Sequence, residues 1–119
     1  MSENIVLDKS YKFALRIVKL FNYLTDEKKE FVLSKALLTA GTNVGAHVKA
    51  AQEAESKQDF YYEMSAALKN ASKTEYWLQL LYDGQFLDDK QFTSIHADCE
   101  EIIRLTKSIT RPTRRTPDD

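Results

Sequence analysis

Residues 33–81 read LSKALLTAGTNVGAHVKAAQEAESKQDFYYEMSAALKNASKTEYWLQLL, and this stretch decides the fold. Its second half repeats a mostly apolar or small residue at regular intervals, in the series Phe60, Met64, Ala67, Ala71, Thr74, Leu78 and Leu81. The steps alternate between four and three positions, which is the spacing of a helix packed lengthwise along another helix. The stretch therefore predicts two long helices joined by a short polar break at residues 54–59.

The first half carries a similar seam, made of Leu33, Leu37, Ala40, Val44, Val48 and Ala51. Gly41 and Gly45 lie within this expected helix. In a helix interior each glycine lowers the stability by about 1 kcal/mol relative to alanine. They could mark a kink near residues 41–43, or they could let a neighbouring helix approach closely. The seam continues through both glycines without a change of phase, which favours an unbroken helix. The expected close-packing residues are Ala40, Gly41, Gly45 and Ala67.

The rest of the chain is consistent with more helices of the same kind. There are 3 Gly and 2 Pro among 119 residues, and both prolines lie in the last eight positions. A body so poor in helix breakers indicates an all-α domain, and its short connections make successive helices antiparallel neighbours. The sequence predicts an up-down-up-down four-helix bundle over residues 1–110, followed by a flexible basic and polar tail over residues 111–119.

Capping residues and apolar stripes set the expected helix limits. The first helix is expected to run from a cap at Asp8 or Ser10 to about Leu24, and the second from Asp26 to about Ala54. The third is expected to run from a cap at Ser56 or Asp59 to about Asp83, with Gly84 in the left-handed position beyond it. The fourth is expected to begin at a cap at Asp88. The inward residues are expected to be Ala14, Ile17, Val18 and Phe21 in the first helix, and Phe92, Ile95, Cys99, Ile102, Ile103 and Ile109 in the fourth.

Three large side chains lie beside the expected core stripes and are candidates for an interface. Phe13 and Leu20 widen the apolar face of the first helix, and Trp77 lies beside the main seam of the third helix. A wide core face explains Phe13 and Leu20 as well as a second subunit does. Trp77 fits either a second packing layer or an interface anchor.

No arrangement of residues predicts catalysis. Di-iron bundles need paired Glu-x-x-His motifs, which the chain lacks. His96 and Cys99 share one helix face and could bind zinc only with a distant residue such as His47. Cys99 is expected to lie in the core, where a thiol behaves as a small apolar group. We therefore expect no enzyme activity, no metal and no cofactor.

Cations and aromatic side chains suggest a nucleic-acid surface. Tyr62, Lys69, Lys73 and Tyr76 fall on one stripe of the third helix, where cations can contact phosphates and aromatic rings can stack on bases. An ordinary solvated face is the alternative. A second basic run contains no acid over residues 102–117 and consists of Arg104, Lys107, Arg111, Arg114 and Arg115. The net charge of −1 means that such a surface would be local.

The single cysteine excludes an internal disulfide and fits a reducing compartment. The N-terminus shows no signal peptide, and no apolar run approaches the roughly 20 residues that span a bilayer. We expect a cytoplasmic protein with no membrane partner.

Several linked segments resemble the family of four-helix bundle proteins first named for open reading frames in 23S rRNA intervening sequences. The segments are residues 38–48 (LTAGTNVGAHV), 54–60 (AESKQDF), 66–71 (AALKNA) and 74–81 (TEYWLQLL). They are similar to the family's small-residue segment, its third-helix start and its YWL segment. His47 stands where the family has Asn, and Asn70 where it has Glu.

The resemblance implies a fold, an assembly and a class of partners. It implies a bundle that assembles as a homopentamer and that is not an enzyme. A related branch contains accessory proteins of diversity-generating retroelements, which bind a reverse transcriptase and nucleic acid through basic surfaces. The implied partners are therefore other copies of the chain, RNA or DNA, or a reverse-transcriptase-like protein.

Overall fold

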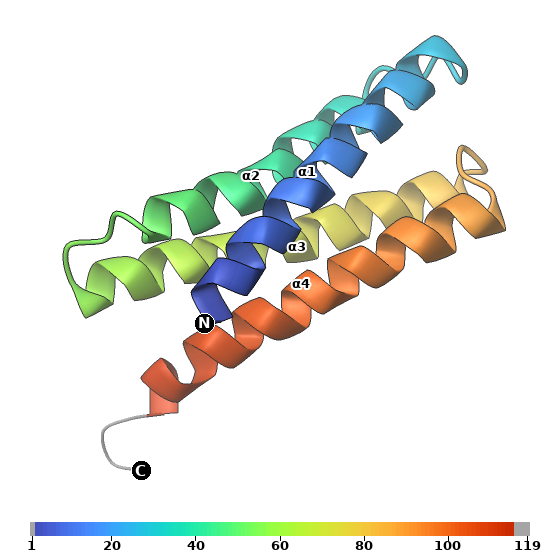
Figure 1. The fold of residues 1–119 in the computed structure, drawn as a ribbon. Helices are drawn as coiled ribbons and strands as arrows, with labels where there is room; N and C mark the ends of the chain where they lie inside the picture. The colour runs from blue at the N-terminus through green and yellow to red at the C-terminus, as the bar shows by residue number, and fades with distance from the viewer. Residues whose placement is uncertain (1, 116–119) are drawn as a thin grey trace.

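A computed structural model describes the backbone of residues 2–115 and the side chains of residues 5–111. This part of the chain forms four helices: α1 (Ser2–Asp26), α2 (Leu33–Ala51), α3 (Lys57–Asp83) and α4 (Asp89–Arg115). They lie side by side in an elongated bundle whose extents are 50 × 25 × 22 Å (Figure 1). The predicted all-α four-helix bundle is confirmed.

The bundle is closed, because each helix contacts two neighbours. The sequential pairs α1–α2, α2–α3 and α3–α4 pack together, and α1 also contacts α4. The predicted seams of α2 and α3 face inward, and most of their residues are buried: Leu37, Ala40, Val44, Val48, Ala51, Met64, Ala67, Ala71, Thr74, Leu78 and Leu81. Leu33 and Phe60 are half-buried at the ends of these seams. The heptad spacing therefore identified the core of both central helices.

Helix α2 is unbroken through both glycines, as predicted, and the close neighbour is α1. A Cβ atom at Gly41 would lie 2.8 Å from Cγ1 and 2.9 Å from Cγ2 of Ile17. A Cβ atom at Gly45 would lie 3.3 Å from the carbonyl oxygen of Ser10. The two glycines thus let the backbones of α1 and α2 approach more closely than larger residues allow.

The limits and inward face of α1 differ from the prediction. The helix begins at Ser2, well before the expected caps, and its Ser10 hydroxyl donates to the carbonyl oxygen of Leu7 inside the helix. Its buried residues are Val6, Ser10, Phe13, Ile17 and Leu24. Val18, expected in the core, is 40% exposed, and Ala14 and Phe21 are only half-buried. The buried face is rotated around the helix because α1 must cover both α2 and α4.

The start of α2 also differs from the prediction. Residues 27–32 form a connection, and the helix begins at Leu33 and ends at Ala51. Glu30 lies before the helix, and its carboxylate accepts backbone N–H groups of Val32 (3.2 Å), Leu33 (2.9 Å) and Ser34 (2.7 Å). A carboxylate three residues ahead of the helix therefore replaces the expected cap at Asp26.

Helix α3 begins at Ser56, one of the two predicted caps, and ends in a different way from the expected one. The Ser56 hydroxyl accepts the N–H of Asp59 at 3.0 Å. At the other end Gly84 has a φ of −81°, and Gln85 takes the left-handed conformation with a φ of 71°. The N–H of Phe86 donates to the carbonyl oxygen of Leu81 at 2.8 Å, which closes the turn around Gln85.

Helix α4 begins with the predicted Asp88 cap. The Asp88 carboxylate accepts the N–H of Gln91 at 2.7 Å, and the Gln91 side chain accepts the N–H of Asp88 at 2.9 Å. Ile95, Cys99 and Ile102 are buried as predicted, whereas Phe92, Ile103 and Ile109 are half-buried. The helix runs to Arg115, so it includes the first residues of the expected tail at 111–119, and residues 116–119 lie outside the described part.

Candidate functional site

The cationic and aromatic stripe of α3 lies on the surface. Tyr62 is 65% and Tyr76 is 59% exposed, and Lys69 and Lys73 between them are also exposed. The stripe lies opposite the buried seam of α3, so all four side chains point away from the bundle. The predicted exposure of this stripe is confirmed, and its binding of nucleic acid stays a prediction.

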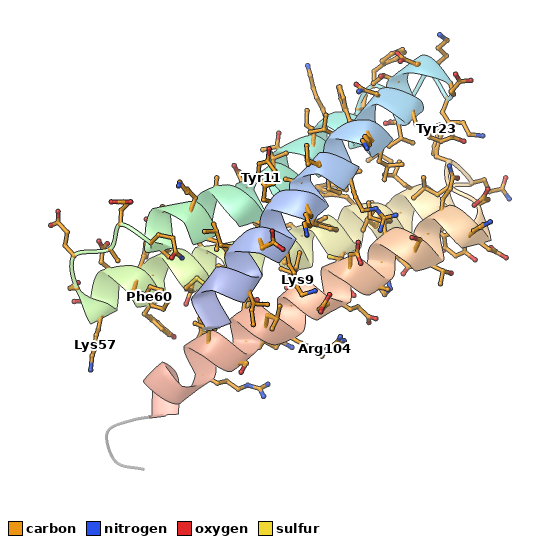
Figure 2. All side chains as sticks on the ribbon, viewed as in Figure 1. Lys9, Tyr11, Tyr23, Lys57, Phe60 and Arg104 are labelled. Carbon is orange, nitrogen blue, oxygen red and sulfur yellow. The ribbon has the colours of Figure 1, made fainter. Side chains whose placement is uncertain are left out.

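The basic run of α4 lies on an exposed face of the helix that neighbours α3. Arg104, Lys107 and Arg111 are exposed, and Arg104 projects from the outer side of α4 (Figure 2). The α3–α4 register is set by the Glu75–His96 contact and by the Cys99 thiol, which donates to the carbonyl oxygen of Ala71.

Continued along the antiparallel pair, this register places Arg104 level with Ala67, and Lys107 level with Met64. The two basic stretches therefore run along adjacent helices. Arg114 and Arg115 lie within the bounds of α4, but their side chains are outside the described residues.

These outward cations differ from the cations between α1 and α4. Across that junction Lys9 pairs with Glu101 at 3.2 Å, and Arg16 pairs with Asp98 at 2.6 Å. Arg16 also donates to the Ser94 hydroxyl at 2.9 Å. Among the residues whose side chains are described, Lys69, Lys73, Arg104, Lys107 and Arg111 have no carboxylate within 4.0 Å. Their charge is available to a partner, whereas the charges on Lys9 and Arg16 already hold two helices together.

A second surface feature is an apolar stripe on α1. Tyr11 is 64%, Leu15 46% and Val18 40% exposed, and their spacing of four and three places them on one face. Tyr11 lies on the side of α1 next to α2 (Figure 2). There it borders a groove of about 730 Å³ whose lining includes Leu7, Ala14, Gly45 and Ala46. The small side chains of α2 leave the groove open.

The three residues predicted for an interface are not the residues that form this stripe. Phe13 is 1% exposed and lies in the core, so its selection as an interface residue was wrong. Leu20 and Trp77 are half-buried and pack against the core, and the ring of Trp77 meets the Tyr76 ring edge-on at 5.1 Å. The 4-3 spacing of Tyr11, Leu15 and Val18 is visible in the sequence, but the predicted core stripe of the first helix includes Val18.

The residues considered for zinc or nucleophilic chemistry are separated in the structure. His47 contacts Glu63 between α2 and α3 at 2.8 Å, and His96 contacts Glu75 between α3 and α4 at 2.9 Å. Cys99 is buried, and burial, with smaller contributions from Glu75, Glu100 and Asp98, raises its thiol pKa to about 12. A thiol held in its protonated form is a poor nucleophile and a poor metal ligand.

Comparisons with known proteins place the chain in a family. In the described residues, no helix has the length and apolar character needed to cross a bilayer. No curated protein matches the chain. The chain is similar to a protein of unknown function from the S23 ribosomal protein family of Bacteroides thetaiotaomicron, whose crystal structure is known. The two sequences are 45% identical, and the two structures superpose with a TM-score of 0.92. The similarity covers 93% of this chain and 99% of that one. A family model described as 23S rRNA-intervening sequence protein matches residues 2–108, and the chain belongs to this family.

Proposed function

We propose that this protein is a non-catalytic, cytoplasmic homo-oligomer, of five copies, that binds nucleic acid or a nucleoprotein through the outward faces of α3 and α4. The observation that carries the proposal is the run of exposed cations without carboxylate partners in the described residues, formed by Lys69, Lys73, Arg104, Lys107 and Arg111. Tyr62 and Tyr76 flank the two lysines of α3 and offer rings for stacking.

The apolar stripe of α1 supports the assembly part of the proposal. An exposed aromatic residue and two exposed aliphatic residues on one helix face, beside an open groove, are the features of a surface that another chain covers. We assign a second copy of this chain as the occupant. The basic faces of α3 and α4 stay exposed in such an assembly, so that several copies present them together and bind one nucleic acid with increased avidity.

The burial of the Cys99 thiol and the pairing of the His47 ring support a role without catalysis. The thiol of Cys99 is buried, and the His47 ring is paired with a carboxylate on a neighbouring helix. These groups therefore contribute to packing between helices. The single free thiol also suits a reducing compartment.

A titration with fluorescently labelled single-stranded RNA at two salt concentrations tests the proposal. The double variant Lys69→Glu/Lys73→Glu should weaken binding and should reduce the slope of log K against log salt by about 0.7 for each lost phosphate contact. The double variant Lys35→Glu/Lys90→Glu changes two exposed lysines elsewhere and alters the net charge equally, so it is the matched control.

The two double variants distinguish binding through the α3 stripe from binding that depends only on net charge. Equal loss of binding in both variants would show that net charge, not the α3 stripe, governs binding. Absence of salt-sensitive binding by the unaltered protein would contradict the nucleic-acid part and favour a purely protein-binding oligomer. Arg114→Glu/Arg115→Glu then tests the contribution of the end of the chain.

A further inference from the structure

We propose that Glu75, His96 and Glu100 bind a divalent transition-metal ion, with zinc as the ion of choice, which joins α3 to α4. Each of the three residues offers one ligand atom, and these atoms lie within 4.8 Å of one another. Nitrogen from histidine and oxygen from carboxylates are ligands that zinc accepts, with water completing the tetrahedron. Neither the nucleic-acid surface nor the apolar stripe includes these residues.

The two nitrogens of the His96 ring lie toward two different carboxylates. Nε2 lies 2.9 Å from Glu75 Oε2, and Nδ1 lies 3.8 Å from Glu100 Oε1. A neutral imidazole carries one N–H group and one lone pair, so one of the two carboxylates faces a lone pair. A metal ion binds one ring nitrogen through its lone pair, so the carboxylate on the other nitrogen must turn toward the ion to become a ligand. The cluster therefore offers one histidine nitrogen and two carboxylates to a cation.

Aromatic stacking holds the histidine ring in place before any ion binds. His96 stacks on Phe92 with ring centroids 4.8 Å apart, and Phe92 stacks on Tyr82 at 4.4 Å. The Tyr82 hydroxyl donates to Asp89 at 2.6 Å and fixes the far end of the stack. A ring that is already oriented loses little freedom when it binds a metal ion.

The carboxylates are positioned to close around an ion. Ligand atoms in a tetrahedral zinc site lie about 3.4 Å apart, given metal–ligand distances of about 2.0–2.2 Å. The Glu75 pair at Nε2 is slightly closer than this, at 2.9 Å, whereas the Glu100 pair of 3.8 Å involves the other ring nitrogen, Nδ1. The Glu100 side chain is 52% exposed on the same helix as His96, so it can move toward the ring by a change of rotamer. Water reaches the site from the same side.

The chain contains a natural control for this site. His47 also pairs with a carboxylate, but only Glu63 contacts it, and no third ligand lies nearby in the described residues. The two histidines are otherwise similar, because each ring lies between two neighbouring helices and is partly buried. Zinc should therefore depend on His96 and not on His47.

The test is zinc binding to untagged, EDTA-treated protein, measured by calorimetry and by the melting temperature. We expect one zinc ion per chain and a rise of about 10 °C at a hundredfold excess over Kd. Glu75→Gln, His96→Gln and Glu100→Gln should each lower the affinity at least tenfold. His47→Gln should bind zinc as the unaltered protein does, and so should Cys99→Ser, because the thiol is not among the proposed ligands.

Three outcomes would overturn the proposal. The first is the absence of heat and of a melting shift with micromolar zinc. The second is unchanged binding in the His96→Gln or Glu75→Gln variant. The third is loss of binding in Cys99→Ser while that variant still melts cooperatively. Circular dichroism of each variant without metal shows whether it is folded, so a loss of affinity is not mistaken for unfolding.

Discussion

At the scale of single residues, the contact between Gly41 and Ile17 decides how closely α1 and α2 pack. Gly41→Ala should gain about 1 kcal/mol of helix propensity but lose about 1–3 kcal/mol from overlap with the Ile17 side chain. Because a branched side chain cannot move aside easily, we expect net destabilisation, measured as a lower midpoint of urea unfolding.

A double-mutant cycle with Ile17→Ala isolates this contact. That change removes the atoms nearest to the new methyl group, so Gly41→Ala should become neutral or stabilising in the Ile17→Ala background. An equal cost in both backgrounds would mean that Gly41 is needed for a reason other than the approach of α1.

Glu30 is a residue whose effect depends on pH. Burial raises its pKa, but the N–H groups of Leu33, Ser34 and Val32 outweigh burial, so the pKa lies below the ordinary value. Its stabilisation is therefore complete above the unfolded pKa of about 4.3 and is lost as the pH falls through the lower folded value. Glu30→Gln should cost about 1–2 kcal/mol at pH 7 and much less at pH 3.

Urea unfolding at both pH values measures this difference. Glu27→Gln is the matched control, because Glu27 is an exposed residue of the same connection. A cost of Glu30→Gln that stays constant between pH 7 and pH 3 would show that the carboxylate charge does not stabilise the start of α2.

At the scale of the helices, the sequence predicted the two central elements better than the outer ones. The seams of α2 and α3 have one inward direction, and the heptad spacing of Val44, Val48, Met64 and Ala71 identifies it. Helix α1 covers two neighbours, so its inward face is broad, and the sequence alone could not place Val18 outside it.

The capping residues also show that the sequence predicts local contacts better than contacts that depend on the folded chain. Ser56 and Asp88 act locally within their own turn, and the sequence predicted Asp88 and offered Ser56 and Asp59 as alternatives. Glu30 acts across a connection whose path depends on Lys29, which has a φ of 54°, and no local pattern indicates that path. For the surfaces, spacing along α3 predicted which side chains are exposed together. The relation between α3 and α4 needed the register of the folded bundle.

The contact between α3 and α4 can be followed through Cys99. Its thiol is buried against the Ala71 carbonyl, so a thiol reagent reaches it only when α4 separates from α3. We expect metal-free native protein to react with an aromatic disulfide at pH 8 at least a hundredfold more slowly than urea-unfolded protein does. Comparable rates would show that α4 opens readily.

At the scale of the whole molecule, the apolar stripe of α1 predicts how chains associate. Tyr11→Glu/Leu15→Glu places two charges on that stripe and should reduce the mass in solution to that of one 13.7 kDa chain. Tyr62→Glu/Leu80→Glu changes an exposed tyrosine and leucine of α3 and should leave the assembly intact.

Light scattering combined with size exclusion measures both masses. A single-chain mass for the unaltered protein at micromolar concentration would contradict the proposed assembly. Dissociation by the α3 variant instead of the α1 variant would move the interface to α3 and would remove that face from the nucleic-acid surface.

The polar junction between α1 and α4 also has a consequence for how the chain folds. Three of the four helix contacts join neighbours in sequence, and such local contacts form quickly. The contact of α1 with α4 closes a loop of nearly the whole chain. The positive charges of Lys9 and Arg16 attract the carboxylates of Glu101 and Asp98 on α4. We expect this closure to come after the transition state. Arg16→Met should therefore accelerate unfolding in stopped-flow experiments while the refolding rate stays nearly constant.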